Sequence, residues 1–339
     1  MQEFKVRGME NMLRKTLILT RSEIETLADY KMAIQCVEEV FGDYAKAKAK
    51  MPAKVYLDLK EFQGDFRAMP AYWERKNAVA LKWVNAHPQN LQKDLPSVMA
   101  IVVLNDPRTG FPLCIMDGTY LTGLRTAAGG AVAAKYLAGK DLRSVGLVGC
   151  GVQARSQLMA LRELFLIKKV LVWGHKEELI KKFIQEMKTL KEDMVGVDSI
   201  KDCVKDANLV VTTTPSRRPL VKFSWLKEGV HINAIGADAP GKQELDPKIL
   251  KHAKIVVDDI RQAAHGGEIN VPFQKGIITL KDIYATLGEI IAGKKKGRIN
   301  NTEITVFDST GLAIQDVACA HLIYKLALQR KKGRWVRII

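Results

Sequence analysis

The spacing of hydrophobic residues changes near residue 120 and divides the chain into two patterns. The first begins with a helical segment at residues 16–50 and continues as short runs in which apolar and polar residues alternate. A period of two is typical of half-buried strands, and turn sequences such as "DPRTG" separate the runs. We therefore expect an α+β domain on an antiparallel sheet, with strands at residues 53–59, 65–73, 77–85, 97–106 and 112–118.

The second pattern follows an alanine-rich helix at residues 120–139. Its strands are short, continuous apolar runs, as expected for parallel strands covered on both faces, and helical segments separate most of them. This alternation predicts the α/β class with a doubly wound parallel sheet. The expected strands are residues 144–149, 169–174, 194–198, 208–214, 230–237, 254–259 and 303–309.

A last apolar helix at residues 311–332 follows the final strand, and we expect it to pack back on the first domain. That domain is then discontinuous and comprises residues 1–125 and 311–339. The doubly wound domain comprises residues 126–310.

The sequence "SVGLVGCGVQARSQL" joins a strand to a helix through a glycine-rich turn. Gly149, Gly151 and Ala154 fill the G-x-G-x-x-G/A pattern of the Rossmann dinucleotide-binding fold. Gly149 permits a tight turn, Gly151 lets the backbone approach a pyrophosphate, and the helix N-terminus offers free N–H groups to the anion. Because further strand–helix units follow, the motif predicts a bound dinucleotide.

The end of the next strand indicates which dinucleotide to expect. An acidic residue there would bind the free ribose hydroxyl of NAD, whereas this chain has Gly174, His175 and Lys176. A small residue followed by basic ones leaves room and positive charge for the 2′-phosphate of NADP. Alternatively, Glu177 or Glu178 reaches back to the ribose. The cofactor is NAD or NADP, and this one short loop favours NADP.

Lys82 lies in "AVALKWVNAHP", residues 78–88, which has the apolar pattern of a strand. On a strand, Lys82 and Val84 share one face, and Leu81 and Trp83 share the other. The lysine either extends to solvent from an edge strand or points into an enclosed site. In an enclosed site, burial would lower its pKa, so that it could donate and accept a proton near neutral pH.

Further charged residues lie at positions where ligands could bind. Arg67, in "GDFRAMP", could hold a carboxylate through its planar guanidinium, and Lys54 lies on a neighbouring strand. Cations on one face of a sheet would repel one another without an anion, which indicates an acidic small substrate. Asp238 follows a parallel strand, at the end where α/β sheets bind ligands, although a turn or helix cap is the alternative.

Composition narrows the classes of protein. The 339 residues carry a formal net charge of +16, but basic residues are spread among acids, which favours a solvated surface or anionic small molecules over nucleic acid. The five cysteines form no CxxC pair, so we expect neither a disulfide framework nor a metal site. No apolar run could span a membrane and "MQEFKVRGMENMLRK" lacks a signal-peptide core, so we expect a cytoplasmic protein.

Several motifs in one order resemble the ornithine cyclodeaminase/μ-crystallin family, and within it the archaeal alanine dehydrogenase branch. The similarity runs from about residue 17 to residue 325. It implies a homodimer in which a dimerisation and substrate domain faces a Rossmann domain across a cleft. The motifs are "GDFRAMPAYW", "ALKWVNAHP", "LPSVMA", "DGTYLTGLRTAAGGAVAAKYLA", "GCGVQA", "VTTTPSRRP", "HINAIGADAPGKQELDP", "HGGEIN" and "VFDSTGLAIQD".

The resemblance also implies roles for individual residues. Lys82 would be the acid/base residue and Asp238 its catalytic companion. Arg67 and Lys54 would hold the substrate carboxylate, and Arg125, in "LRTAA", would meet the cofactor's phosphate. The other cofactor neighbours that it implies are Val152, Gln153, Gly236, Ala237, Asp238, Lys242 and Ser309.

Two departures from the family pattern affect the expected function. Cyclodeaminases of the family carry Glu where this chain has Arg67, which argues for an imine–amine redox reaction and against cyclodeamination. The alanine dehydrogenase branch usually has an acid at the end of the second Rossmann strand, where this chain reads "WGHK". That difference places a preference for NAD in doubt.

We therefore expect an NAD(P)-dependent amino-acid dehydrogenase similar to alanine dehydrogenase, acting in the reversible reductive amination of pyruvate. One alternative is ornithine cyclodeaminase, a lyase that forms proline and ammonia without net turnover of cofactor. A cyclic ketimine reductase would share Lys82 and Asp238. A non-catalytic cofactor-binding protein is disfavoured, because Lys82, Arg67 and Asp238 are all present.

Overall fold

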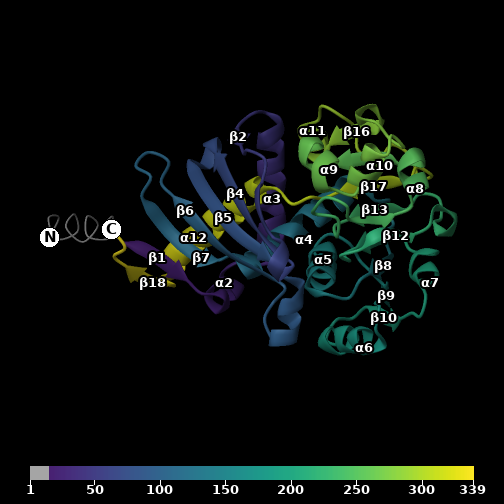
Figure 1. Cartoon of the computed structure of the whole chain (residues 1–339), viewed down its shortest axis with the longest axis horizontal. Helices are drawn as coiled ribbons and strands as arrows, with labels where there is room; N and C mark the ends of the chain where they lie inside the picture. The colour runs from purple at the N-terminus through teal and green to yellow at the C-terminus, as the bar shows by residue number, and fades with distance from the viewer. Residues whose placement is uncertain (1–14) are drawn as a thin grey trace. The chain divides into compact units, whose positions relative to one another are not determined.

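The computed structural model describes residues 15–339 (Figure 1). Residues 1–14, which carry most of the stretch used above to argue against a signal peptide, lie outside the described residues. The chain forms two compact units. The first unit comprises Met1–Cys36, Ala47–Arg125 and Ala313–Ile339, and the second comprises Val37–Lys46 and Thr126–Leu312.

The first unit is built on a sheet of order β18-β1-β7-β6-β5-β4-β2, in which β3 also pairs with β4. The strands are β1 (Thr16–Leu19), β2 (Ala49–Lys50), β3 (Val55–Leu59), β4 (Gly64–Trp73), β5 (Ala78–Ala86), β6 (Val98–Asn105), β7 (Pro112–Asp117) and β18 (Arg334–Val336). The helices are α2 (Arg21–Leu27) and α12 (Ala313–Arg330), with the ends of α3 (Tyr30–Ala45) and α4 (Gly118–Leu137) that fall in this unit.

The expected antiparallel sheet is confirmed from β4 to β7, where each strand pairs antiparallel with the next. Short connections enforce this direction; in the β6–β7 turn, for example, Gly110 has a φ of 76° and donates to the carbonyl of Asp106. The sheet differs from the expectation at β1, because Thr16–Leu19, which was assigned to the helical segment, forms a strand that pairs parallel with β7. Because a long stretch of chain separates these two strands, no hairpin dictates their direction.

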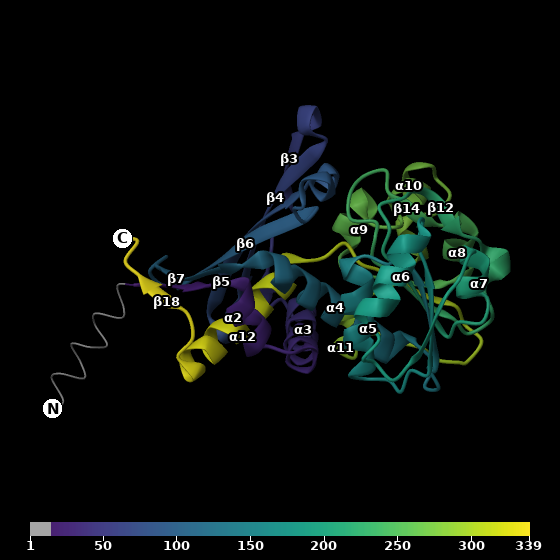
Figure 2. The same ribbon diagram turned by 90° about the horizontal axis from the view of Figure 1, so that it is seen from below.

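One face of this sheet is covered by α12, which packs against β4, β5 and β6. Figure 2 shows α2 and α12 on the same side of the sheet. β5 lies between β4 and β6, so the edge-strand alternative for Lys82 is wrong. The alternation along β5 places Lys82 on the covered face and Leu81 and Trp83 on the opposite one.

The second unit contains a sheet in which every neighbouring pair of strands is parallel, in the order β10-β9-β8-β11-β13-β17-β15-β16. The predicted α/β fold with a parallel sheet is therefore confirmed. The strands are β8 (Ser144–Val148), β9 (Lys169–Trp173), β10 (Asp193–Gly196), β11 (Leu209–Thr212), β13 (His231–Ala234), β15 (Lys254–Val257), β16 (Ile283–Thr286) and β17 (Thr305–Asp308). The helices that lie wholly in this unit are α5 (Val152–Arg162), α6 (Glu177–Glu186), α7 (Ile200–Val204), α8 (Pro247–His252), α9 (Ile260–Gly266), α10 (Asn270–Gln274) and α11 (Leu287–Ile291).

Three strands of this unit were not predicted. β16 forms the end of the large sheet, and β12 (Arg217–Val221) and β14 (Gln243–Leu245) form a separate pair. β16 has a single buried residue among half-buried ones, β12 is mostly exposed, and β14 is only three residues long, two of them polar. None has the long, continuous apolar run that identified the other strands. Their pairing depends on tertiary context, which no local pattern reports.

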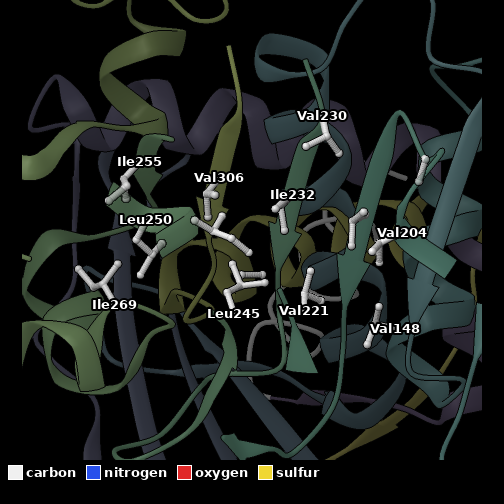
Figure 3. Packing of buried hydrophobic residues seen from close by; sticks show 14 of the residues in the cluster. Val148, Val204, Val221, Val230, Ile232, Leu245, Leu250, Ile255, Ile269 and Val306 are labelled. Carbon is white, nitrogen blue, oxygen red and sulfur yellow. The ribbon is translucent and has the colours of Figure 1, made fainter. Parts of the chain in front are cut away.

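The core of the second unit consists largely of branched aliphatic side chains from the parallel strands and the helices beside them (Figure 3). Ile232 and Val306 come from neighbouring strands, and Val204 comes from α7. Each is fully buried, and burying a side chain of this size stabilises the fold by about 1.5–3 kcal/mol. This packing fixes the strand ends from which the loops of the site emerge.

All five cysteines lie in the described residues and have free thiols. Four of them are buried, where they act as small apolar side chains. Between residues 15 and 339, no helix is long and apolar enough to cross a membrane.

Candidate active site

Lys82 is fully buried in the first unit, beneath α12. Its Nζ donates to Asp316 Oδ1 over 2.9 Å. Arg125 approaches the same oxygen, with Nε at 3.1 Å, and its Nη1 donates to Gln315 Oε1 over 2.9 Å. One buried carboxylate is therefore shared by two buried cations, which come from β5 and α4.

This arrangement determines the proton affinity of the lysine. Burial disfavours the ammonium form, the nearby Arg125 guanidinium repels it, and Asp316 acts in the opposite direction, so that the pKa of Lys82 falls to about 7. An amine with this pKa is present in both protonation states near neutral pH. It meets the requirement for a general acid and base that the sequence predicted.

Arg67, on β4, is also buried and lies on the same face of the sheet as Lys82. Its Nε and Nη2 donate to the two carboxylate oxygens of Asp65, over 2.7 and 3.0 Å, and its guanidinium lies 5.3 Å from the centre of the Tyr56 ring. These contacts fix the plane of the guanidinium. Arg67 was predicted from the sequence as a candidate carboxylate-binding residue, whereas its partner Asp65 was not predicted.

Positive charge predominates around Lys82. Lys54 is half-buried and close enough to contribute to the lowered pKa of Lys82. Arg67, on the same face of the sheet, and Arg125, which shares Asp316 with Lys82, bring further positive charge to this part of the first unit. An anion is therefore the ligand that this face of the first unit can best accommodate, because its charge would relieve the repulsion.

The glycine turn of the second unit has the geometry that its pattern predicts. Gly149 has a φ of 113°, and a Cβ there would lie 2.6 Å from Thr213 Oγ1. Gly151 is the N-cap of α5, no side chain caps this helix, and a Cβ at Gly151 would meet no described atom within 4 Å. Ala154 is fully buried at the start of α5. The turn thus leaves open space at a helix N-terminus, where a pyrophosphate binds favourably.

Buried polar atoms near the strand ends indicate further ligand contacts. Within residues 15–339, Gln153 Oε1, Thr213 Oγ1 and Ser309 Oγ are buried without a hydrogen-bond partner. They follow β8, β11 and β17, at the ends of the parallel strands where dinucleotides bind. Unpaired buried polar atoms are costly, so a polar ligand at these atoms would stabilise the site. These residues fit a dinucleotide cofactor.

The end of β9 bears on the choice between NAD and NADP. Gly174 has a packing role, since a Cβ there would lie 2.5 Å from Cys150 Sγ. His175 and Lys176 are exposed. Glu177 pairs with Lys181 of its own helix at 2.6 Å, which disfavours the alternative that it reaches back to a ribose. The preference for NADP over NAD that this loop indicates stays a prediction.

The loop after β13 carries Gly236, the buried Ala237 and Asp238. Asp238 Oδ1 accepts a hydrogen bond from Lys242 Nζ over 2.5 Å. Asp238 is not an N-cap residue of any helix in the described chain, so the capping alternative is not supported. The structure keeps Asp238 and Lys242 together in the second unit, apart in sequence from the Lys82 cluster.

The loop is held by two carboxylates that the sequence analysis did not name. Glu244 accepts hydrogen bonds from Thr212 Oγ1, Thr214 Oγ1 and the backbone N–H groups of Thr214 and Gly236. Glu268, in "HGGEIN", accepts from the backbone N–H groups of Glu244 and Leu245. Both are fully buried, and desolvation raises the pKa of each. They fix the ends of β11 and β13 to the segment that follows Asp238.

Comparison with known proteins identifies the family. The ornithine cyclodeaminase/mu-crystallin family model matches residues 14–331. The chain belongs to this family.

Relatives within the family are similar over almost their whole length. The alanine dehydrogenase of Archaeoglobus fulgidus is 52% identical over 325 residues, covering 95% of this chain and 98% of that protein. A solved archaeal alanine dehydrogenase dimer with bound NAD superposes with a TM-score of 0.92 at 52% identity, covering 96% of this chain and 100% of the other. The Thermococcus litoralis Δ1-pyrroline-2-carboxylate reductase, solved with NADH and L-proline, gives a TM-score of 0.93 at 40% identity, covering 95% and 100%.

The family resemblance inferred from the motifs is therefore confirmed, and so is the expectation of an NAD(P)-binding Rossmann fold. The structure brings Lys82, Arg125, Arg67 and Lys54 into one unit. In the second unit it places the glycine turn, Asp238, Lys242 and Ser309 at the strand ends. The neighbours of Arg125 in the structure are Gln315 and Asp316, and its contact with a cofactor phosphate stays a prediction.

Asp316, the buried partner of Lys82, was not predicted from the sequence. It lies in the first turn of α12, where an acid is also expected because it stabilises the helix dipole. A signal was nevertheless available, since the residues around it in "LAIQDVACA" are apolar and small. An acid within an otherwise apolar helix needs a buried partner. Among the described residues, no group of His, Cys, Asp or Glu could hold a metal ion.

Proposed function

We propose that this protein is an NAD(P)-dependent amino-acid dehydrogenase of the alanine dehydrogenase type. It would reductively aminate pyruvate, consuming ammonium, NAD(P)H and a proton, and release alanine, NAD(P)⁺ and water. The observation that carries the proposal is the buried Lys82–Asp316 pair on a cationic face, in a chain 52% identical to an alanine dehydrogenase. The reverse reaction would use the same groups.

The cations of the first unit provide for recognition of a carboxylate. Arg67 is held in its plane by Asp65 and Tyr56, and Lys54 adds charge nearby. In the proposed mechanism Arg67 and Lys54 bind the pyruvate carboxylate and orient the keto carbon toward Lys82. A charge-assisted hydrogen bond of this kind contributes about 1.5–3 kcal/mol.

Lys82 performs the proton transfers in this proposal. As ammonia adds to the keto carbon, water must leave, and the departing oxygen takes a proton from the Lys82 ammonium. In the oxidative direction the neutral amine takes that proton back. With its pKa near 7, Lys82 supplies either form without a large energetic penalty. Asp238, in the second unit, is assigned the role of charged companion that the family resemblance implied.

A bound nicotinamide would supply the hydride that reduces the imine carbon. Gly149, Gly151 and the N-terminus of α5 would hold its pyrophosphate, and Gln153, Thr213 and Ser309 would provide hydrogen bonds. Val152, exposed at the first position of α5, would lie against the cofactor. His175 and Lys176 would meet the adenosine ribose.

The decisive experiment follows absorbance at 340 nm with purified protein, pyruvate, ammonia and either NADH or NADPH. We expect oxidation of the reduced cofactor that requires both pyruvate and ammonia and disappears in Lys82→Met. Ammonia-independent oxidation with pyruvate would contradict the proposal, because it would indicate ketone reduction. Formation of proline from ornithine without net cofactor consumption would identify a cyclodeaminase.

A second candidate function is the reduction of cyclic ketimines. The Thermococcus litoralis reductase, 40% identical with a TM-score of 0.93, favours it. Such a substrate arrives with its C=N bond already formed, so the same Lys82 and Arg67 would serve, and ammonia would not be needed. Turnover of Δ1-pyrroline-2-carboxylate that exceeds the turnover of pyruvate plus ammonia at equal concentrations would replace the first candidate by this one.

We further propose that two copies associate through the uncovered face of the first unit's sheet. Leu81, Trp83 and Ile101 are 37%, 38% and 50% exposed, and their strands pair side by side. Val55 and Leu57 extend the same face on β3. An exposed apolar surface of this kind is typical of an interface, and the archaeal alanine dehydrogenase is a dimer.

The molecular mass in solution tests this association. Light scattering of the native protein should give a multiple of the 37.8 kDa chain. Leu81→Glu should reduce it by burying an unpaired charge at the interface. Leu179→Glu is the matched control, because Leu179 is 38% exposed on α6 and outside this sheet. A monomeric native protein, or equal effects of both variants, would contradict the proposal.

A further inference from the structure

The Lys82 cluster contains an acid shared by a cation that titrates and a cation that does not. Asp316 Oδ1 accepts from Lys82 Nζ at 2.9 Å and lies 3.1 Å from Arg125 Nε. Lysine can lose its proton, whereas the guanidinium of arginine stays charged at any physiological pH. The three side chains lie in the first unit, and none is more than slightly exposed.

The contact of Asp316 with both Lys82 and Arg125 becomes important when Lys82 loses its proton. In a simple buried lysine–carboxylate pair, deprotonation would leave an isolated buried anion, which is strongly unfavourable. Here the Arg125 contact remains, so that the carboxylate keeps a counter-charge in both protonation states of Lys82. Gln315 Oε1, which accepts from Arg125 Nη1, holds the guanidinium in place while this occurs.

The second carboxylate oxygen of Asp316 leaves part of the hydrogen-bonding capacity of this side chain unused. Asp316 Oδ2 is buried and has no hydrogen-bond partner in residues 15–339. A helix-dipole role would not require this acid to be buried, because a first-turn carboxylate interacts with the helix terminus while exposed. Burial with one free acceptor fits a residue selected for its effect on Lys82.

We propose that Asp316 is a positioning residue for the acid/base lysine, and that Arg125 is the permanent counter-cation that lets Lys82 change its protonation state. This inference rests on the proposed function for its catalytic consequence. The electrostatic part, that Asp316 and Arg125 set the proton affinity of Lys82 in opposite directions, can be measured without any turnover.

Charged groups from several packed elements of the described chain act on Lys82. On α12 the group is Asp316, on α4 it is Arg125, and near β3 it is Lys54. β4 contributes Arg67 with its partner Asp65 on the same face. On β6 the residue directly opposite Lys82 is Val102, which is apolar.

These groups lead to a prediction with opposite signs. Removing the carboxylate leaves Lys82 among cations, which lowers its pKa further. Removing the guanidinium relieves repulsion, which raises it. No residue with a purely structural role would shift the titration of Lys82 in this paired manner.

The test is a titration of Lys82 by carbon NMR in protein carrying ¹³C-labelled lysine, with the signal assigned by its loss in Lys82→Met. The native midpoint should lie near 7, as the lowered pKa indicates. Asp316→Asn keeps the shape of the side chain and should lower the midpoint by about 1–3 units. Arg125→Gln should raise it. Asp316→Glu retains the charge and should keep the midpoint close to the native value.

Asp202→Asn is the matched control. Asp202 is also a first-turn acid and also pairs with a lysine, at 2.8 Å from Lys205, but that pair is exposed. It should leave the Lys82 midpoint unchanged. If Asp316→Asn does not fold, Arg125→Gln still tests the proposal through the sign of its shift. An unchanged midpoint in Asp316→Asn, or a lowered one in Arg125→Gln, would overturn it.

Kinetics then separates this inference from the proposed function. In Asp316→Asn the pH profile of kcat for reductive amination should move to lower pH, because the ammonium form of Lys82 is lost earlier as pH rises. KM for pyruvate should change less than kcat. If no amino acid is turned over but the NMR shifts appear, the proposed function fails while the electrostatic assignment stands.

Discussion

The glycine turn of the second unit and the lysine cluster of the first contrast in how they are built. Gly149, Gly151 and Ala154 lie within six consecutive residues, and their backbone geometry alone prepares a phosphate site. Lys82 and Asp316 are 234 positions apart, and only the folded sheet brings them together. A cofactor site can thus be recognised from local spacing, whereas an acid/base site of buried charges depends on tertiary structure.

The largest effect should follow from removing Lys82, the proposed acid/base residue. This variant tests whether the lysine cluster contributes to catalysis without contributing to cofactor binding. Lys82→Met should reduce kcat about 10²–10⁴-fold, the usual contribution of a general acid–base group. Affinity for NADH or NADPH should stay at the native value, since the glycine turn lies in the other unit. Stopped-flow turnover and a fluorescence titration of the cofactor measure the two quantities.

The control for this variant is Lys205→Met, which removes an exposed lysine from the pair with Asp202. It should change neither quantity. A loss of cofactor affinity in Lys82→Met equal to the loss of kcat would contradict the separation of roles, because it would show that one region serves both.

The next effect tests the glycine turn. Gly151→Val would place a branched side chain in the space at the start of α5, and we expect cofactor affinity to fall about 10- to 100-fold through lost hydrogen bonds to the charged pyrophosphate. Thermal stability should change little, because no described atom lies within 4 Å of the added Cβ. Calorimetric titration with NADH or NADPH measures the loss.

Gly139→Val provides the comparison, since a Cβ at Gly139 also meets no described atom within 4 Å and this residue precedes the first Rossmann strand. Native affinity in this variant together with weak binding in Gly151→Val would support a pyrophosphate site at the turn. Equal affinities in the two variants would refute it.

The same contrast explains how far the sequence predicted the fold. Strands of the parallel sheet that are continuous apolar runs, such as β8 and β11, were identified from their composition. β12 and β14 were missed because their residues favour no strand locally and pair only in the folded loop. β1 was missed because its residues were assigned to the helical segment that follows, and its pairing across a long connection obeys no turn rule.

The candidate site likewise has a part that local sequence predicted and a part that it did not. The glycine turn was predicted with its geometry, while Lys82 was left between an edge strand and an enclosed site until its neighbours β4 and β6 were known. Asp65, Asp316, Glu244 and Glu268 were missed, because an acid in a strand, loop or first helical turn is most often a surface or capping residue. Burial, which decides their importance, is a tertiary property.

A smaller effect should follow from removing Arg67, the residue proposed to bind the substrate carboxylate. Arg67→Ala should raise KM for pyruvate about 10- to 150-fold, the value of one strong charge-assisted hydrogen bond or slightly more. Cofactor affinity should be unaffected. Initial rates over a range of pyruvate concentrations measure KM, and circular dichroism checks the fold, because Asp65 loses its partner.

Arg108→Ala is a close control, since Arg108 also pairs with an aspartate two residues earlier, Asp106. Its side chain is 79% exposed, against 8% for Arg67. An exposed pair of this kind contributes little, so KM should not change. If Arg67→Ala lowers kcat but leaves KM at its native value, Arg67 is not a determinant of carboxylate binding.

The smallest effect concerns the loop after β9, which is predicted to set the preference for NADP over NAD. His175 and Lys176 are exposed, so replacing Lys176 by Ala should weaken NADPH binding by only about 2- to 5-fold, the range of a solvent-screened ion pair. Binding of NADH should not change, because it lacks the 2′-phosphate. The ratio of the two dissociation constants, measured at low and high salt, isolates this contribution. A native protein that binds NADH more tightly than NADPH, with a ratio indifferent to Lys176→Ala, would show that Gly174 is small because Cys150 packs against it, and that the loop does not select NADP.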